Sequence, residues 1–388
     1  MLIAERAEGV IHCPRGGHGE FGGSHASGLV FPCVSPRAIS LTSGPTRMKW
    51  LITGGAGFIG CHAAEQFHKA GHDVVVVDNL SRRGADANLE WLRSRGVAQF
   101  VKADVRDPRA MNDLLARHAD ADAVLHLAAQ VAVTTSVADP RTDFEVNALG
   151  TLNILEAVRT VAKGRPAVLY SSTNKVYGNL EHVRVVEAGG RYAYENLPGG
   201  VDESEPLDFH SPYGCSKGSA DQYVRDYSRI YGLKTVVFRQ SCVYGARQFG
   251  IEDQGWVAWF CIAATMRRPF TIFGDGKQIR DALWVGDMVN VYERALERID
   301  LTSGEVFNIG GGPSNTLSLL ELVGHLERSC GHALRPRFAD WRPGDQRVFV
   351  ADVTKAERLL DWRPTVSTAE GVNRLIAWVQ ENQALFGA

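Results

Sequence analysis

The sequence predicts an α/β fold in which a doubly wound parallel sheet carries helices on both faces and a smaller C-terminal domain follows. Three observations predict it. Apolar strands and helices alternate from residue 48 onward, a glycine-rich turn joins the first strand to the first helix, and an acidic residue closes the second strand. Strands covered on both faces are continuously apolar, and alternation with helices favours parallel pairing.

The predicted elements run in regular order through the first half of the chain and less regularly after it. The expected strands are 49–53, 73–78, 99–104, 123–129, 167–172, 235–239 and 270–273. The expected helices are 57–70, 87–95, 108–118, 142–162, 212–231, 254–267, 286–299, 317–328, 353–360 and 370–384. Gly, Pro and charged residues interrupt the alternation over 178–211. We therefore expect a first domain over 48–237 and a second mainly over 238–388, from which some segments return to the sheet.

The first 47 residues differ from the rest of the chain. They are rich in Gly, His and Ser and show no hydrophobic periodicity, so we expect a disordered N-terminal extension. A transit peptide is one alternative, because residues 21–47 contain no acidic side chain. A protein start at Met48 is another, because a clean strand follows it directly.

Charge and cysteine content exclude several classes of protein. The net charge is −2 and no basic stripe alternates with aromatic residues, which argues against a nucleic-acid partner. The seven cysteines form no CxxC pair and none stands at metal-ligand spacing from a histidine, so we expect free thiols, no metal site and a reducing, cytoplasmic location. No apolar run approaches the roughly 18 residues of a membrane span.

The turn after the first strand has the spacing of a dinucleotide-binding loop. TGGAGFIG places Gly54, Gly57 and Gly60 at GxxGxxG spacing, with Phe58 and Ile59 in the first helical turn. Glycine lets the backbone turn tightly and approach a pyrophosphate, and the N-terminus of the helix offers N–H donors to it. Together with the flanking strand and helix, the motif predicts a Rossmann-type cofactor site.

The end of the second strand favours NAD over NADP. Asp78 stands where a carboxylate accepts hydrogen bonds from the adenosine ribose hydroxyls and repels a 2′-phosphate. Arg82 and Arg83 follow closely, and arginines there are the alternative that would serve a 2′-phosphate.

The end of the third strand supplies further candidates for the cofactor site. Asp104 is expected near the adenine, and its alternative role is to cap the following helix. We include the neighbouring Asn79 and Val105 in the predicted cofactor site.

A serine/threonine strand end and a Tyr-x-x-x-Lys pair form the candidate catalytic group. Thr173 follows the strand AVLYSS at the sheet edge where ligands bind, and PYGCSK places Tyr213 and Lys217 one helical turn apart. A nearby ammonium and the positive nicotinamide are expected to lower the pKa of the tyrosine. The tyrosine then acts as a general base toward a sugar hydroxyl while NAD takes the hydride. The Thr173 hydroxyl would hold the same oxygen.

The motifs TGGAGFIG, HLAAQVA, SSTNKVYG, SPYGCSK and RPGD, in this order, resemble the extended short-chain dehydrogenase/reductase family over residues 48–388. The resemblance implies that Thr173, Tyr213 and Lys217 are catalytic, that Lys217 also bonds the nicotinamide ribose, and that NAD is the cofactor. It further implies that Ala128, Ala129 and Gln130 form the loop over the pyrophosphate.

The resemblance also implies where a nucleotide sugar binds. Arg280 in KQIRD and Arg342 and Asp345 in RPGD match positions that hold the diphosphate and ribose, and Thr173 and Asn174 would face the sugar. An arginine fork suits a diphosphate. The alternative for both arginines is a surface salt bridge.

The residues after Thr173 separate reactions within this family. Sugar 4,6-dehydratases carry Asp-Glu there as acid and base, whereas this chain has Asn174 and Lys175. STNKVYG and DQGWVAWF resemble the branch that epimerises C2 of CDP-linked deoxysugars through a transient keto sugar. A sugar-nucleotide 4-epimerase and a non-catalytic NAD-binding regulator are the alternatives. The expected partners are the nucleotide sugar and further copies of the chain, in a dimer or tetramer.

Overall fold

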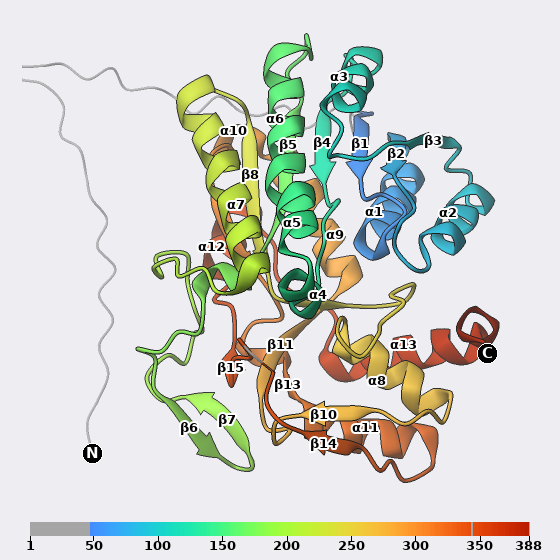
Figure 1. The fold of residues 1–388 in the computed structure, drawn as a ribbon, viewed down its shortest axis with the longest axis vertical. Helices are drawn as coiled ribbons and strands as arrows, with labels where there is room; N and C mark the ends of the chain where they lie inside the picture. The colour runs from blue at the N-terminus through green and yellow to red at the C-terminus, as the bar shows by residue number, and fades with distance from the viewer. Residues whose placement is uncertain (1–46, 343, 388) are drawn as a thin grey trace, which may run out of the picture. The chain divides into compact units, whose positions relative to one another are not determined.

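A seven-stranded sheet forms the centre of the computed structural model, which describes residues 47–342 and 344–387. Its order is β12-β8-β5-β4-β1-β2-β3, and every neighbouring pair is parallel (Figure 1). Its strands are β1 (Lys49–Thr53), β2 (Asp73–Asp78), β3 (Gln99–Lys102), β4 (Ala123–His126), β5 (Ala167–Thr173), β8 (Thr235–Gln240) and β12 (Val306–Ile309). The predicted doubly wound fold is confirmed. The expected N-terminal extension, apart from Arg47, lies outside the described residues.

Helices cover both faces of this sheet because its strands are apolar on both sides. In β1, Trp50 and Ile52 join the core that includes α1 and α9, whereas Leu51 joins the core that includes α3, α6 and α7. These helices and their neighbours are α1 (Phe58–Lys69), α2 (Ala85–Ser94), α3 (Pro108–Arg117), α4 (Val133–Ala138), α5 (Pro140–Phe144), α6 (Gly150–Thr160), α7 (Ser211–Tyr231), α9 (Val285–Glu297), α10 (Ile299–Thr302) and α12 (Thr354–Leu360).

The strand order reverses between β1 and β4, which pair with Thr53 opposite His126. The chain turns to β2 and β3 on one side of this point and to β5, β8 and β12 on the other. Crossing connections leave a crevice at the carboxyl ends of the strands at such a point, and ligands bind there. The glycine turn after β1 and the loop after β4 therefore meet at one edge.

A second region of short strands and three helices lies at this edge (Figure 1). Helices α8 (Trp256–Thr265), α11 (Leu319–Cys330) and α13 (Thr368–Glu381) share a hydrophobic core of their own. The short strands are β6 (Val185–Ala188), β7 (Arg191–Tyr194), β9 (Cys242–Tyr244), β10 (Thr271–Phe273), β11 (Ile279–Trp284), β13 (Thr316–Ser318), β14 (Arg337–Ala339) and β15 (Val348–Phe349). Although β12 stands between β11 and β13 in sequence, it lies in the central sheet. The domain limits at residues 237 and 238 stay a prediction.

Two expected elements differ in the structure. The expected strand 123–129 ends at His126, because the chain leaves the sheet to form the loop after β4. The expected helix 142–162 is interrupted by a π-helical turn, Glu145–Leu149, between α5 and α6. Such a turn inserts one residue into the hydrogen-bond ladder and is frequent at functional sites. Here it carries Asn147, whose buried side chain bonds the loop after β4.

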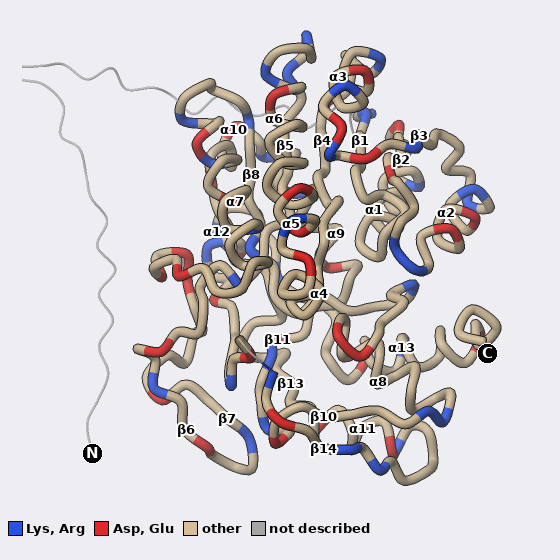
Figure 2. The backbone as a smooth tube through the Cα atoms, viewed as in Figure 1, with Lys and Arg blue, Asp and Glu red and all other residues tan. Residues whose placement is uncertain are grey.

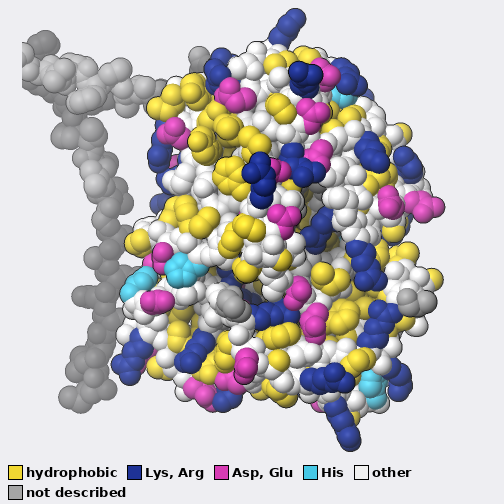
Figure 3. All heavy atoms as spheres, in the orientation of Figure 1, with side chains coloured by type: hydrophobic (Ala, Val, Ile, Leu, Met, Phe, Trp, Pro, Cys, Tyr) yellow, Lys and Arg dark blue, Asp and Glu magenta, His cyan; other side chains and the backbone are white. Residues whose placement is uncertain are grey.

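Charges of both signs are interspersed along the described chain (Figure 2), in keeping with the small net charge. Hydrophobic side chains gather over α6 and α7 (Figure 3), where Tyr223, Ile230 and Tyr231 of α7 are exposed together with Phe144 of the neighbouring α5. None of the described helices has the length and apolar character needed to cross a membrane.

Candidate active site

Two cavities meet at the carboxyl edge of the sheet. The first, of about 400 Å³, is lined by every residue predicted to bind the cofactor. The second, of about 320 Å³, is lined by every residue predicted to bind the substrate. Thr173 and Tyr213 line both cavities, so their side chains lie on the boundary between them.

The glycine turn after β1 packs tightly against the backbone of the loop after β4 in the first cavity. Gly54 has φ +70°, and a Cβ there would lie 2.7 Å from the backbone nitrogen of Ala128 in the loop after β4. A Cβ on Gly60 would lie 2.2 Å from the Gly54 oxygen. The turn therefore requires glycine at both positions, and it leaves the N-terminus of α1, which begins at Phe58 after Gly57, facing the cavity.

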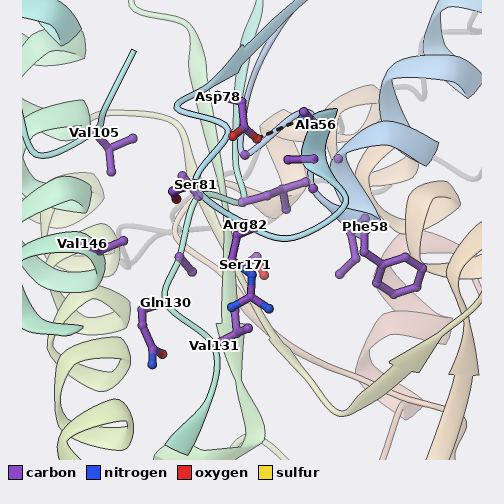
Figure 4. Close-up of a pocket in the computed structure, with 18 of the residues that line it drawn as sticks. Ala56, Phe58, Asp78, Ser81, Arg82, Val105, Gln130, Val131, Val146 and Ser171 are labelled. Carbon is purple, nitrogen blue, oxygen red and sulfur yellow. Dashed lines mark hydrogen bonds between the residues drawn. The ribbon is translucent and has the colours of Figure 1, made fainter. Parts of the chain in front are cut away.

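Asp78 ends β2 with its carboxylate held in place (Figure 4). One oxygen accepts from the Ala56 N–H at 3.1 Å and the other from the Leu80 N–H at 2.8 Å. Burial raises the pKa of this carboxyl group, and these backbone hydrogen bonds oppose the shift. The carboxylate is therefore oriented before any ligand binds.

Asp104 stands beside Asp78 on the wall of the first cavity. It accepts from the Asn79 side chain at 3.0 Å and forms a salt bridge with Arg106 at 2.8 Å. The Arg106 hydrogen bond lowers the pKa of Asp104 to about 2. The helix-capping alternative is wrong for this residue, because Asp107 caps α3 by accepting from two backbone N–H groups.

A buried polar network behind the loop after β4 was not predicted from the sequence. Asn147 accepts from the Gln130 N–H at 2.9 Å and donates to Asp143 and to Ser216, each at 3.1 Å. Ser216 donates to Asp143 at 2.5 Å. The network ties the loop that carries Ala128, Ala129 and Gln130 to α7. Only a break in the predicted helix 142–162 could have revealed this network. The amino-acid pattern over these residues contains no such break.

The catalytic candidates come from two elements. Thr173 ends β5, and Tyr213 and Lys217 lie in the first two turns of α7, all three buried. The Lys217 ammonium donates to the Ser171 carbonyl at 2.5 Å and lies 4.3 Å from the centre of the Tyr170 ring. Burial lowers the pKa of Lys217 to about 7, against the attraction of Asp221 and Asp143.

The pKa of the tyrosine departs from the prediction made from the sequence. Burial raises the pKa of Tyr213 to about 12, although a hydrogen bond with Thr173 and the charge of Arg82 act in the opposite direction. In the protein without cofactor Lys217 does not lower this pKa, because burial penalises the phenolate and the ammonium is directed at Ser171. The lowering expected with the nicotinamide bound stays a prediction.

The second cavity holds the predicted arginines in ion pairs. Arg280 on β11 donates to Asp345 at 3.0 Å. Arg342 pairs with Asp253 at 2.9 Å and lies 3.7 Å from the centre of the Phe273 ring. The salt bridges named as an alternative do form, but they line the cavity next to Thr173 and Asn174.

Lys175 also faces the second cavity, although sequence reasoning used it only to exclude a carboxylate. Its ammonium donates to the Gly344 carbonyl at 3.2 Å, and burial together with Arg280 lowers its pKa to about 8. The aromatic residues Trp256 and Phe260 line the same cavity. Both belong to DQGWVAWF, so this motif already contained two residues that line the substrate cavity.

Comparisons with known proteins agree with this geometry. The family model described as GDP-mannose 4,6 dehydratase matches residues 51–375. The CDP-paratose 2-epimerase of Salmonella typhi is 50% identical over 336 residues, which cover 85% of this chain and 99% of that protein.

Solved structures of UDP-glucose 4-epimerases are also similar. The Thermotoga maritima enzyme with UDP-glucose has a TM-score of 0.74 at 33% identity and covers 87% of this chain and 100% of its own. The Thermus thermophilus enzyme with NAD has a TM-score of 0.73 at 32% identity and covers 86% and 100%. The chain therefore belongs to the GDP-mannose 4,6-dehydratase family of the extended short-chain dehydrogenases/reductases, as its motifs predicted.

Proposed function

We propose that this chain is an NAD-dependent epimerase that inverts C2 of a CDP-linked deoxysugar without net oxidation or reduction. One observation carries the proposal. Thr173 and Tyr213 lie on the wall shared by a cavity with dinucleotide-binding features and a cavity lined by arginines. The 50% identity with a CDP-paratose 2-epimerase over nearly all of that protein supports the choice of sugar and carbon.

The first cavity fits NAD on the geometry of its walls. The close backbone contacts at Gly54 and Gly60 exclude a Cβ and leave the N-terminus of α1 facing the cavity, where it suits a pyrophosphate. The fixed Asp78 carboxylate suits ribose hydroxyls and repels a 2′-phosphate. NAD, when bound, accepts and returns a hydride. We assign the backbone of Gly57, Phe58 and Ile59 to the pyrophosphate. The other assigned cofactor residues are Asn79, Asp104, Val105, Ala128, Ala129, Gln130 and Lys217.

The residues on the shared wall handle the proton. Tyr213 takes the proton of the sugar hydroxyl at its phenolate oxygen, Thr173 holds the same hydroxyl, and the proton returns from Tyr213 when the carbonyl is reduced. Because the pKa of Tyr213 is about 12 in the protein alone, the phenol is protonated there at neutral pH. A positive charge on the bound cofactor would favour the phenolate, so the base forms only in the loaded site.

Inversion requires the sugar to present both faces to the cofactor, so its nucleotide must stay anchored while the sugar turns. Arg280 and Arg342 suit this role as bidentate donors to a diphosphate, with Asp345 beside them. Asn174 and Lys175 offer no carboxylate to remove water, so elimination lacks its acid and base.

Product analysis tests the assignment. The purified protein is incubated with CDP- and UDP-linked sugars in parallel, and the products are identified by NMR. A CDP-sugar inverted at C2 is the expected product. Inversion of a UDP-sugar at C4 would favour instead the reaction named in the solved relatives, the UDP-glucose 4-epimerases.

We also propose a cytoplasmic homo-oligomer. Cys61, Cys215, Cys242, Cys261 and Cys330 are free thiols, as expected in a reducing compartment. The exposed apolar residues over α6 and α7 support contact with another copy, as a dimer or tetramer (Figure 3). Light scattering at several concentrations measures the oligomeric state.

A further inference from the structure

One arginine of the cofactor cavity has no role in the assignments above. Arg82 lies in the loop between β2 and α2, and its side chain projects into the cavity (Figure 4). The residue is exposed to solvent. Its Nη2 donates at 3.1 Å to the side-chain oxygen of Gln254, which stands on the wall shared with the second cavity.

The contacts of Arg82 with other described residues do not neutralise its positive charge. Within residues 47–342 and 344–387, no carboxylate forms an ion pair with Arg82, and its hydrogen bond goes to a neutral amide. A guanidinium carries five N–H donors, so most of them remain available to a ligand. A cation placed in this way suits an anionic group inside the cavity.

Arg83 also lines this cavity, and two further cations of the cavity already have partners in the protein. Lys217 is bonded to Ser171. Arg247 lies 3.9 Å from the centre of the Trp91 ring. The N-terminus of α1 supplies N–H donors but only a partial positive charge. A full cation would complement the two negative charges of a dinucleotide pyrophosphate, and the side chain of Arg82 projects into the cavity (Figure 4).

We infer that Arg82 binds the pyrophosphate of the bound dinucleotide and, through its hydrogen bond to Gln254, closes the cavity over it. The inference rests on the proposed function, because it takes NAD as the ligand. It also explains how the cofactor stays bound in a reaction that must return the hydride to the same sugar. Gln254 connects this closure to the substrate side, since the neighbouring Asp253 pairs with Arg342.

The retention of NAD tests the inference without measuring turnover. Arg82→Met removes the charge and keeps the length of the side chain, and Arg109→Met is the matched control at an exposed arginine of α3 that lines neither cavity. Each purified protein is loaded with NAD, and free NAD is trapped by a coupled alcohol dehydrogenase and read as NADH fluorescence. We expect release from Arg82→Met to be about 10- to 100-fold faster, the loss typical of a charged hydrogen bond. Arg109→Met should release NAD at the wild-type rate.

Further measurements make the result specific. Release from the wild type should accelerate with salt, and release from Arg82→Met should respond much less. Arg82→Lys should restore part of the retention, because it keeps the charge but not the fork. Circular dichroism melting of each variant confirms that it is folded.

The possible results distinguish the role of Arg82 in holding NAD from the proposed epimerisation of a CDP-sugar. Equal release from the two Met variants overturns the inference and leaves the reaction intact. A loss of NADP binding with unchanged NAD retention also overturns it, because Arg82 would then serve a 2′-phosphate. NAD retention can depend on Arg82 while the protein leaves CDP-sugars unchanged. That result would support the role of Arg82 and overturn the proposed epimerase function.

Discussion

The two cavities of the site are built in different ways. The cofactor cavity is formed largely by backbone: a glycine turn, a helix N-terminus and the ends of β2, β4 and β5. The substrate cavity is formed by long side chains on short elements, and its arginines are already paired with Asp253 and Asp345. A backbone site is shaped before its ligand arrives, whereas the arginines must exchange protein partners for a diphosphate. The first should therefore respond to substitution by losing structure, and the second by losing affinity.

The largest effect should come from the wall that the cavities share. Tyr213→Phe keeps the ring and removes the oxygen that accepts the proton. We expect turnover to fall by about 10²- to 10⁴-fold while the bound NAD is unchanged. Initial rates and the NAD released on denaturation measure the two quantities. A Phe variant with nearly full turnover would remove Tyr213 from the base role.

On the substrate side, Arg280→Met should raise KM by about 10- to 100-fold, because one charged hydrogen-bond donor to the diphosphate is lost. The NAD content should stay at the wild-type level. Full kinetics against the CDP-sugar measure the change, and Arg337→Met on the exposed strand β14 is the control. An unchanged KM would show that Arg280 serves only its salt bridge with Asp345.

On the cofactor side, Gly54→Ala should lower the free energy of unfolding by about 1–3 kcal/mol and release NAD, because φ is +70° and Ala128 is in contact. Gly71→Ala is the matched control: φ is +90°, but nothing lies within 4 Å of a Cβ. It should cost only the strain of the positive φ and leave NAD bound. Equal NAD loss in both variants would show that the close approach at Gly54 is unimportant. Denaturant titrations give the energies.

The smallest effect is a pH dependence of stability. Burial lowers the pKa of Lys217 to about 7, whereas the unfolded chain keeps its ordinary value near 10.5, so the unfolded state binds more protons between these values. Stability from this group therefore rises with pH between about 7 and 10.5, and it is fully lost once the pH has fallen to about 7. Lys217→Met should raise Tm near pH 7 by about 2–5 °C, and the gain should shrink toward pH 10.

Lys175 of the substrate cavity provides the comparison for this measurement. The pKa of Lys175 is lowered only to about 8, so Lys175→Met should give a smaller gain in Tm, over a narrower range of pH. Melting curves between pH 7 and 10 measure both variants. A larger gain for Lys175→Met would contradict the stronger burial of Lys217.

The same contrast explains what the sequence could predict. The glycine turn, Asp78 and the Tyr213/Lys217 pair are local patterns, and the parallel sheet brings them to one edge without further information. The π-helical turn that presents Asn147 and the pairing of β9 with β11 depend on distant partners, so no local pattern encodes them. The pKa of Tyr213 could not be predicted either, because burial depends on the completed fold.

The most direct test of the central claim follows one hydrogen atom. The protein is given a CDP-sugar deuterated at C2, in the presence of excess unlabelled NADH, and the product is examined by NMR. Hydride transfer and return on a retained cofactor predict an inverted C2 that keeps its deuterium, with no NADH consumed. Loss of deuterium to solvent would indicate proton abstraction from carbon, and exchange with the external NADH would show that the cofactor leaves. Either result would contradict the proposed path.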